Sequence, residues 1–136
     1  MTPFVVQRRV EFCETDMAGM VHFSNFFRYM EFAEQEFLRN RGLSVTWQID
    51  GRRFGLPRVA ASCDYLKPAR FEQVLSIAVA IERIGRKSLT YGFEFRHLDE
   101  VIARGRITAV CCREVAAGEI ESIEIPADVR AKLDAT

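Results

Sequence analysis

Hydrophobic and polar positions alternate near the start of the chain and then change to a helical spacing. Between residues 4 and 13, Val6, Val10 and Phe12 share one parity, which predicts a half-buried strand. From about Phe23 to Arg41, apolar residues recur at steps of three and four, which predicts a helix about 28 Å long. Because apolar residues occupy more than one side of this helix, we expect it to lie at the centre of the fold.

The remainder of the chain is dominated by strand-like runs. Residues 43–55 show no clean period and are interpreted as a connecting loop. Four runs without helical spacing follow, at residues 56–67, 72–84, 87–97 and 101–114. The short connections at Gly85-Arg86 and Leu98-Asp99-Glu100 are typical of hairpins, so these strands are expected to be antiparallel neighbours. Pro126 followed by residues 127–133 predicts a short terminal helix.

This order of elements predicts an α+β fold. Along the chain, the predicted elements follow the order β-α-β-β-β-β. One sheet and one largely apolar helix bury most surface when the five strands form an antiparallel sheet that curves around the helix. The short C-terminal helix completes a single domain spanning residues 1–136. The edges of such a sheet are uncovered, and small proteins commonly cover them by pairing with a second copy.

Composition and charge exclude several classes of protein. The 136 residues are 49% hydrophobic, and nineteen Lys and Arg balance nineteen Asp and Glu. A neutral chain is not a generic nucleic-acid binder, because counterion release needs a cationic surplus. We find no apolar run of membrane-spanning length and no secretory signal pattern, so we expect a cytoplasmic protein. The composition is also rich in Phe, and five of the eleven lie between Phe23 and Phe37.

The cysteine and histidine pattern favours neither a metal site nor disulfides. No C-x-x-C pair occurs, and with only His22 and His97 no zinc-binding spacing can be assembled. We expect no metal and no cofactor, and we expect reduced, mostly buried thiols. A nucleophilic Cys13 paired with His22 is the alternative to simple packing. The four cysteines are Cys13, Cys63, Cys111 and Cys112.

The most distinctive segment joins the first strand to the long helix. Residues 14–26 hold Asp16, Gly19 and His22 just before the helix begins. A helix N-terminus offers unpaired N–H groups and a partial positive charge, which suit a developing oxyanion. A carboxylate nearby can act as nucleophile or general base. The alternative is that Asp16 or Ser24 merely caps the helix.

Residues 8–34 resemble a known family. The run R-x-V-E-F-x-E-T-D-M-A-G-M-V-H-F-S-N-F-F-R-Y-M-E-F-A-E is similar to hotdog-fold thioesterases of the 4-hydroxybenzoyl-CoA thioesterase type, which include thioesterases associated with the Tol-Pal system. The segments 64–69 and 84–89 resemble further signatures of that family. The resemblance implies the hotdog fold, whose order of elements is the one predicted above.

The resemblance also implies roles for individual residues. Asp16 matches the catalytic carboxylate, Gly19 the glycine of the tight loop, and Phe23 the residue whose backbone N–H polarises the thioester carbonyl. Asn25 and Glu31 match helix positions near the reacting centre. Contacts to coenzyme A are implied for Arg86, Lys87 and Ser88.

One position departs from the family pattern. Many relatives carry a Tyr-His or an aromatic pair where this chain has His22-Phe23. With the histidine one place earlier, His22 is expected either to touch the substrate or to brace the loop.

The function implied is hydrolysis of a small or medium acyl or aroyl thioester. The thioester of coenzyme A, or of acyl carrier protein, is then substrate rather than cofactor. The alternatives are a hydratase or dehydratase on the same fold and a non-catalytic acyl-CoA-binding module. We expect a homodimer or homotetramer with active sites at subunit boundaries. We also expect Trp47, Phe54 and the partner subunit to form the pocket walls.

Overall fold

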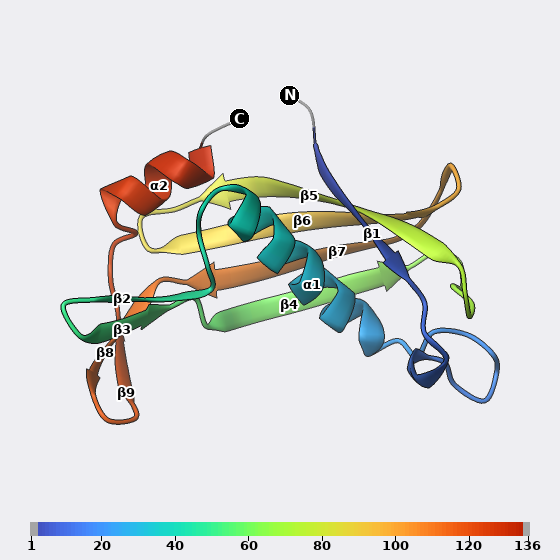
Figure 1. The fold of residues 1–136 in the computed structure, drawn as a ribbon, viewed down its shortest axis with the longest axis horizontal. Coiled ribbons are helices and arrows are strands. Elements are labelled where there is room, and N and C mark those ends of the chain that lie inside the picture. Colours follow the sequence, from blue (N-terminus) through green and yellow to red (C-terminus); the bar gives the residue numbers. More distant parts are fainter. Residues whose placement is uncertain (1–2, 135–136) are drawn as a thin grey trace.

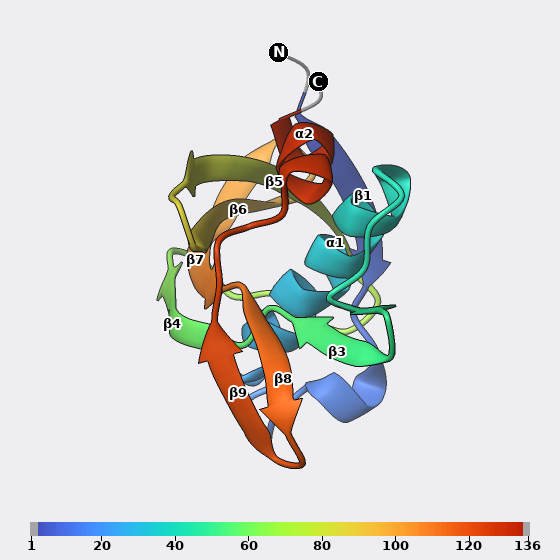
Figure 2. The same cartoon turned by 90° about the vertical axis from the view of Figure 1, so that its left-hand side faces the viewer.

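A helix crosses one face of a five-stranded antiparallel sheet in the computed structural model, which describes residues 3–134 (Figure 1). The helix is α1 (Asn25–Asn40). The sheet curves around it when seen from the side (Figure 2). In order across the sheet, the strands are β1 (Phe4–Arg9), β5 (Val74–Ile84), β6 (Ser88–His97), β7 (Glu100–Val110) and β4 (Arg58–Tyr65).

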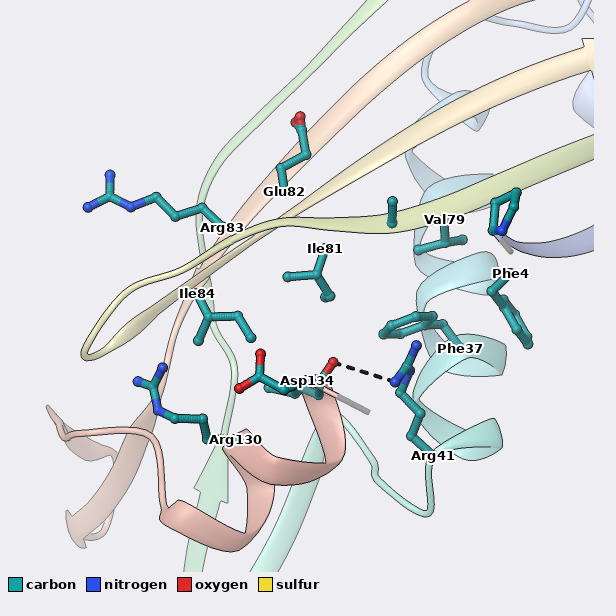
Figure 3. A pocket seen from close by; sticks show the side chains of 13 residues that line it. Phe4, Phe37, Arg41, Val79, Ile81, Glu82, Arg83, Ile84, Arg130 and Asp134 are labelled. Atoms are coloured by element: carbon teal, nitrogen blue, oxygen red, sulfur yellow. Dashed lines mark hydrogen bonds between the residues drawn. The ribbon is translucent and has the colours of Figure 1, made fainter. Parts of the chain in front are cut away.

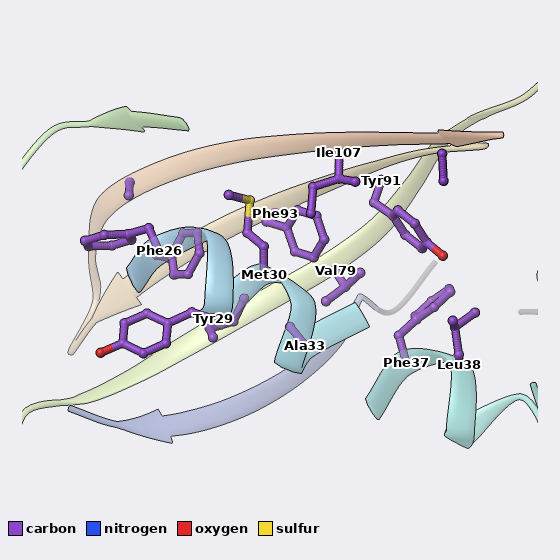
Figure 4. Close-up of a cluster of buried hydrophobic side chains, with 14 of the residues drawn as sticks. Phe26, Tyr29, Met30, Ala33, Phe37, Leu38, Val79, Tyr91, Phe93 and Ile107 are labelled. Atoms are coloured by element: carbon purple, nitrogen blue, oxygen red, sulfur yellow. The ribbon is translucent and has the colours of Figure 1, made fainter. Parts of the chain in front are cut away.

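The core forms between the apolar face of α1 and the concave face of the sheet (Figure 4). The predicted alternation in β5 and β6 is confirmed, because every second residue in the centre of these strands is buried. The helix lies very close to β7 at Gly105, where a Cβ atom would overlap the side chain of Met30. Glycine at this crossing lets the helix and the strand approach without displacing that side chain. The helix contributes Phe26, Tyr29, Met30, Ala33, Phe37 and Leu38 to this core.

The helix is shorter than predicted. It begins at Asn25 because residues 22–24 form a tighter turn, in which the N–H groups of Asn25 and Phe26 donate to the carbonyls of His22 and Phe23 at 2.9 and 3.3 Å. This turn directs Phe23 outward, and its side chain is 62% exposed rather than in the predicted core. At the other end, Gly42 adopts a φ of +70°, which ends the helix.

A second, four-stranded sheet was not predicted. Its order is β2-β3-β8-β9, so the interpretation of residues 43–55 as a loop is wrong. The predicted strand at residues 101–114 is also wrong in extent, because β7 ends at Val110. The first strand likewise ends at Arg9, and a 3-10 turn follows at Phe12–Glu14. The strands of the second sheet are β2 (Thr46–Ile49), β3 (Arg52–Gly55), β8 (Cys112–Ala116) and β9 (Glu119–Ser122).

The terminal helix is α2 (Ala127–Asp134), as predicted within one residue. It packs Val129 and Leu133 into the core. Of the helices in residues 3–134, none combines the length and apolar character needed to cross a lipid bilayer.

The four cysteines are free thiols in different environments. Cys111 and Cys112 are buried, whereas Cys13 is exposed, so the packing role predicted for Cys13 is wrong. Burial raises the pKa of the Cys63 and Cys111 thiols to about 11, and both therefore stay protonated at neutral pH. Within residues 3–134, no three His, Cys, Asp or Glu side chains gather closely enough to hold a metal ion.

Candidate functional site

Asp16 organises the loop that leads to the helix. Its N–H donates to the carbonyl of Met20 at 2.8 Å, and its carbonyl accepts the N–H of Gly19 at 3.0 Å. One carboxylate oxygen, Oδ1, accepts the N–H groups of Ala18 and Met20 at 2.9 and 3.2 Å. Gly19 adopts a φ of +77°, which only glycine reaches without strain. The carboxylate is thus oriented by its own loop and remains exposed.

Neither Asp16 nor Ser24 caps the helix, so the alternative capping role is wrong. Ser24 occupies the N-cap position without a side-chain capping bond, and its hydroxyl lies 2.7 Å from Nδ1 of His22. The N–H of Ser24 also donates to that nitrogen at 3.4 Å. The His22 ring stacks on Phe23, with 4.6 Å between ring centroids. These contacts place the ring where it braces the turn.

The backbone N–H of Phe23 is available to a ligand. Nearby backbone N–H groups already make hydrogen bonds. The N–H of His22 donates to the carbonyl of Glu14 at 2.9 Å, and the N–H of Asn25 donates to the carbonyl of His22. Among residues 3–134, the Phe23 N–H makes no hydrogen bond. This group stands immediately before α1, where the helix dipole adds a partial positive charge.

Asp16 and Phe23 line the same pocket. Its volume is about 360 Å³, and it opens beside the first turn of α1 and the end of β4. The walls are mostly apolar, with Lys67 as a cation. Sequence reasoning gave no role to the wall residues from β4 onward, although residues 64–69 were part of the family resemblance. The lining residues are Asp16, Met20, Val21, Phe23, Phe26, Tyr65, Leu66, Lys67, Pro68 and Ala69.

The carboxylate of Glu14, which is nearly buried, holds the loop through several hydrogen bonds. Glu14 accepts hydrogen bonds from Arg8 at 2.5 Å, from the N–H of Glu11 at 2.7 Å and from the hydroxyl of Tyr29 at 2.9 Å. Burial and this bond to Glu14 raise the pKa of the Tyr29 phenol. The Asn25 amide donates to the Glu14 carbonyl at 2.8 Å. In this structure Asn25 therefore joins the loop to the helix.

Glu31 does not line the pocket that holds Asp16. It is exposed on α1, and its carboxylate lies 3.9 Å from the guanidinium of Arg58. The next acid along the helix, Glu34, is fully buried and binds Arg58 through both carboxylate oxygens. Burial raises the pKa of Glu34, and Arg58 partly offsets that rise. Sequence reasoning missed this pair, because Arg58 comes 24 residues later in the chain.

The predicted coenzyme A contacts lie at the opposite end of the sheet from Asp16. Ser88 pairs with Val110, at the level where Arg58 begins β4, whereas Tyr65 ends β4 beside the Asp16 pocket. Arg86 is ion-paired with Glu124 at 3.4 Å, and Nζ of Lys87 lies 3.5 Å from the hydroxyl of Ser122. Within one chain, the structure does not bring these three residues to Asp16.

Two other cavities lie away from Asp16. One of about 550 Å³ lies between α2, β5 and the end of α1, where Arg41 donates to the carbonyl of Leu133 at 3.5 Å (Figure 3). Another, of about 330 Å³, is lined by Trp47, whose ring stacks on Phe54 at 5.7 Å. The walls expected from Trp47 and Phe54 are therefore not found around Asp16 within one chain.

Comparisons with known proteins agree on one family. A model described as the thioesterase-like superfamily matches residues 10–133. An Aquifex aeolicus protein named as an esterase is 38% identical over 123 residues, covering 89% of this chain and 91% of its own length. The 4-hydroxybenzoyl-CoA thioesterase of Pseudomonas sp. is 32% identical over 85 residues, covering 61% and 60%. A solved gentisyl-coenzyme A thioesterase, 26% identical, covers 97% of this chain and 100% of its own with a TM-score of 0.79, which confirms the predicted hotdog fold.

Proposed function

Because the chain belongs to the thioesterase-like superfamily and is a thioester hydrolase, we propose that it hydrolyses a small or medium acyl- or aroyl-CoA at the Asp16 pocket. The observation that carries this proposal is the shared pocket of the Asp16 carboxylate and the unpaired N–H of Phe23. A thioester needs an attacking oxygen and a donor for the oxygen that becomes negative, and these two groups supply them.

The reaction follows from these two groups. An oxygen attacks the thioester carbon, and the carbonyl oxygen becomes an oxyanion that accepts the N–H of Phe23. Collapse of this intermediate breaks the carbon–sulfur bond and releases the thiolate of coenzyme A. If Asp16 attacks, a mixed anhydride forms and water hydrolyses it; if Asp16 takes a proton from water, the free acid forms directly. A single oxyanion donor of this kind is worth about 3–4 kcal/mol in the transition state.

The pocket walls favour an apolar or aromatic acyl group. Val21, Phe26, Leu66 and Ala69 present apolar surface, and Lys67 supplies a cation beside them. Two of the relatives named above are thioesterases named for hydroxylated benzoyl thioesters, which supports an aroyl group as the first candidate. Acyl carrier protein as the thiol carrier, membership of the Tol-Pal-associated branch and a cytoplasmic location stay predictions.

A panel of acyl-CoA thioesters tests the proposed function. Benzoyl-, 4-hydroxybenzoyl-, butyryl- and octanoyl-CoA are incubated with the protein, and released thiol is measured to give kcat/KM for each. We expect thiol release, with the aroyl thioesters ahead of the aliphatic ones. Binding by calorimetry without thiol release from any of them would instead favour a non-catalytic acyl-CoA-binding module.

We further propose that two copies pair through β4. This strand lies at one edge of the sheet, and residues 59–63 (Val-Ala-Ala-Ser-Cys) are uncharged and mostly exposed. An exposed, uncharged edge strand is a template for pairing with another strand. Val59 is 63% exposed in the single chain, which leaves apolar surface for a partner to cover.

Such pairing also accounts for the position of the predicted coenzyme A contacts. If two β4 strands pair antiparallel about a two-fold axis near Ala61 and Ser62, the start of one strand lies beside the end of the other. The hairpin with Arg86, Lys87 and Ser88 from a second copy then comes to the end of the sheet that holds Asp16. An active site at the subunit boundary follows from this arrangement.

Sedimentation equilibrium tests the pairing. We expect a dimer or tetramer for the wild-type chain, and a monomer for Ala61→Lys, because two lysines would face each other across the two-fold axis. Val5→Lys, on the opposite edge strand β1, is the matched control and is expected to remain oligomeric. A stable, fully active wild-type monomer of 15.6 kDa would refute the pairing.

A further inference from the structure

A tyrosine from the end of β4 anchors the turn that presents the Phe23 N–H. The hydroxyl of Tyr65 donates to the carbonyl oxygen of Phe23 at 3.0 Å, across 42 positions of sequence. The Tyr65 ring packs edge-on against Phe26, with 5.2 Å between centroids and 75° between planes. Tyr65 thus contacts the turn at its carbonyl and at the first turn of the helix.

The anchored carbonyl has little other restraint. It also accepts the N–H of Phe26, but at 3.3 Å, which is long for an N–H···O bond. The Phe23 side chain is mostly exposed and stacks only on the His22 ring, which is exposed too. The Tyr65 bond is therefore the shorter of the two hydrogen bonds to the Phe23 carbonyl, and it restrains one side of residue 23. On the other side, the peptide group that carries the Phe23 N–H is held through the His22 carbonyl, which accepts the N–H of Asn25 at 2.9 Å.

We infer that Tyr65 is a positioning residue for thioester hydrolysis, holding the backbone of residue 23 so that its N–H points at the oxyanion. This inference rests on the proposed function. Oxyanion stabilisation depends on donors fixed before the reaction, so a donor that rotates freely loses part of its effect. Burial, followed by the neighbouring Cys63, raises the pKa of the Tyr65 phenol, which therefore remains a hydrogen-bond donor through neutral and mildly alkaline pH.

A substitution at Tyr65 can distinguish the positioning role of its hydroxyl from the structural role of its ring. Its side chain is 44% exposed, and its ring also forms part of the pocket wall. Tyr65→Phe removes the hydroxyl and keeps the ring, so the wall and the contact with Phe26 stay. The fold is expected to keep its stability, because a hydrogen bond at a residue that is 44% exposed replaces bonds to water and adds little net free energy.

Kinetics of Tyr65→Phe form the first test. We expect kcat for benzoyl-CoA to fall about tenfold with KM within about twofold, because the lost bond acts on the transition state rather than on substrate binding. The matched control is Tyr91→Phe, which removes the same atom from a buried tyrosine in β6 and is expected to leave kcat unchanged. An unchanged kcat in folded, wild-type-stable Tyr65→Phe would overturn the inference.

Infrared spectroscopy measures the hydrogen bond to the thioester carbonyl directly, so a general loss of stability would not by itself change the result. Benzoyl-CoA labelled with ¹³C at the thioester carbonyl is bound to Asp16→Asn, which slows turnover, and to the Asp16→Asn/Tyr65→Phe double variant. A hydrogen bond from the Phe23 N–H lowers the carbonyl stretching frequency, and we expect a smaller lowering in the double variant. Equal frequencies in the two proteins would overturn the inference. A wild-type protein that hydrolyses no acyl-CoA would instead overturn the proposed function.

Discussion

Asp16→Asn is expected to lower kcat/KM for thioester hydrolysis by at least tenfold, and by about 10²–10⁴ if Asp16 acts as general base. The amide cannot attack the thioester as a carboxylate does, and it cannot accept a proton from water at neutral pH. It does retain an oxygen equivalent to Oδ1, which accepts the N–H groups of Ala18 and Met20. The loop should therefore keep its shape while the chemistry fails, and thiol release from benzoyl-CoA measures the loss.

The same substitution at another aspartate serves as a control, because it shows whether changing Asp to Asn affects hydrolysis away from the Asp16 pocket. Asp50 lies in the turn between β2 and β3 with a φ of +51°, a conformation that asparagine also adopts readily. Asp50→Asn is expected to hydrolyse at the wild-type rate. If Asp16→Asn stays folded and its hydrolysis is undiminished, the assignment of Asp16 fails. An acyl group trapped on the wild-type protein by rapid quenching, and located on Asp16 by peptide mapping, would identify Asp16 as nucleophile rather than base.

The main sheet and helix were predictable because their patterns are long. In the centres of β5 and β6, the alternation sets which side chains face the helix, and the structure confirms it. The second sheet escaped prediction because each strand has only four or five residues. Its pairing joins distant segments, such as Phe54 with Arg113, and most of its side chains are exposed. Strands that are short and mostly exposed show no alternation of hydrophobic and polar residues from which they could be predicted.

The candidate site was predictable only in its local part. Asp16 and Phe23 are seven positions apart, on one loop, and the helix that follows explains their placement. Tyr65 reaches Phe23 from the end of β4, and that contact depends on how the strand lies against the helix. Likewise, the register of β6 and β4 places Ser88 at the end of the sheet away from Asp16. Periodicity predicts that strands exist, but it does not predict their register.

The buried pair of Glu34 and Arg58 yields the largest expected effect on stability. The Glu34 side chain is 0% exposed, whereas Arg58 is 28% exposed and binds both oxygens of that carboxylate. Arg58→Met keeps much of the aliphatic stem but leaves the Glu34 charge without its partner. Because an uncompensated buried charge is strongly unfavourable, we expect the free energy of unfolding to fall by about 3–5 kcal/mol at pH 8. Urea unfolding at one fixed protein concentration measures this loss.

The loss should depend on pH and on which partner is removed. Burial already raises the pKa of Glu34, and without Arg58 the pKa rises further. The folded state then binds the proton more tightly than the unfolded state, so stability is highest below the unfolded pKa of glutamate and falls as pH rises through the folded pKa. Arg58→Met should therefore be less destabilised at pH 5 than at pH 8. Glu34→Gln should lose less free energy of unfolding than Arg58→Met, because the partly exposed guanidinium of Arg58 can reach water. A small, pH-independent loss in Arg58→Met would show that the Glu34 charge is satisfied in another way.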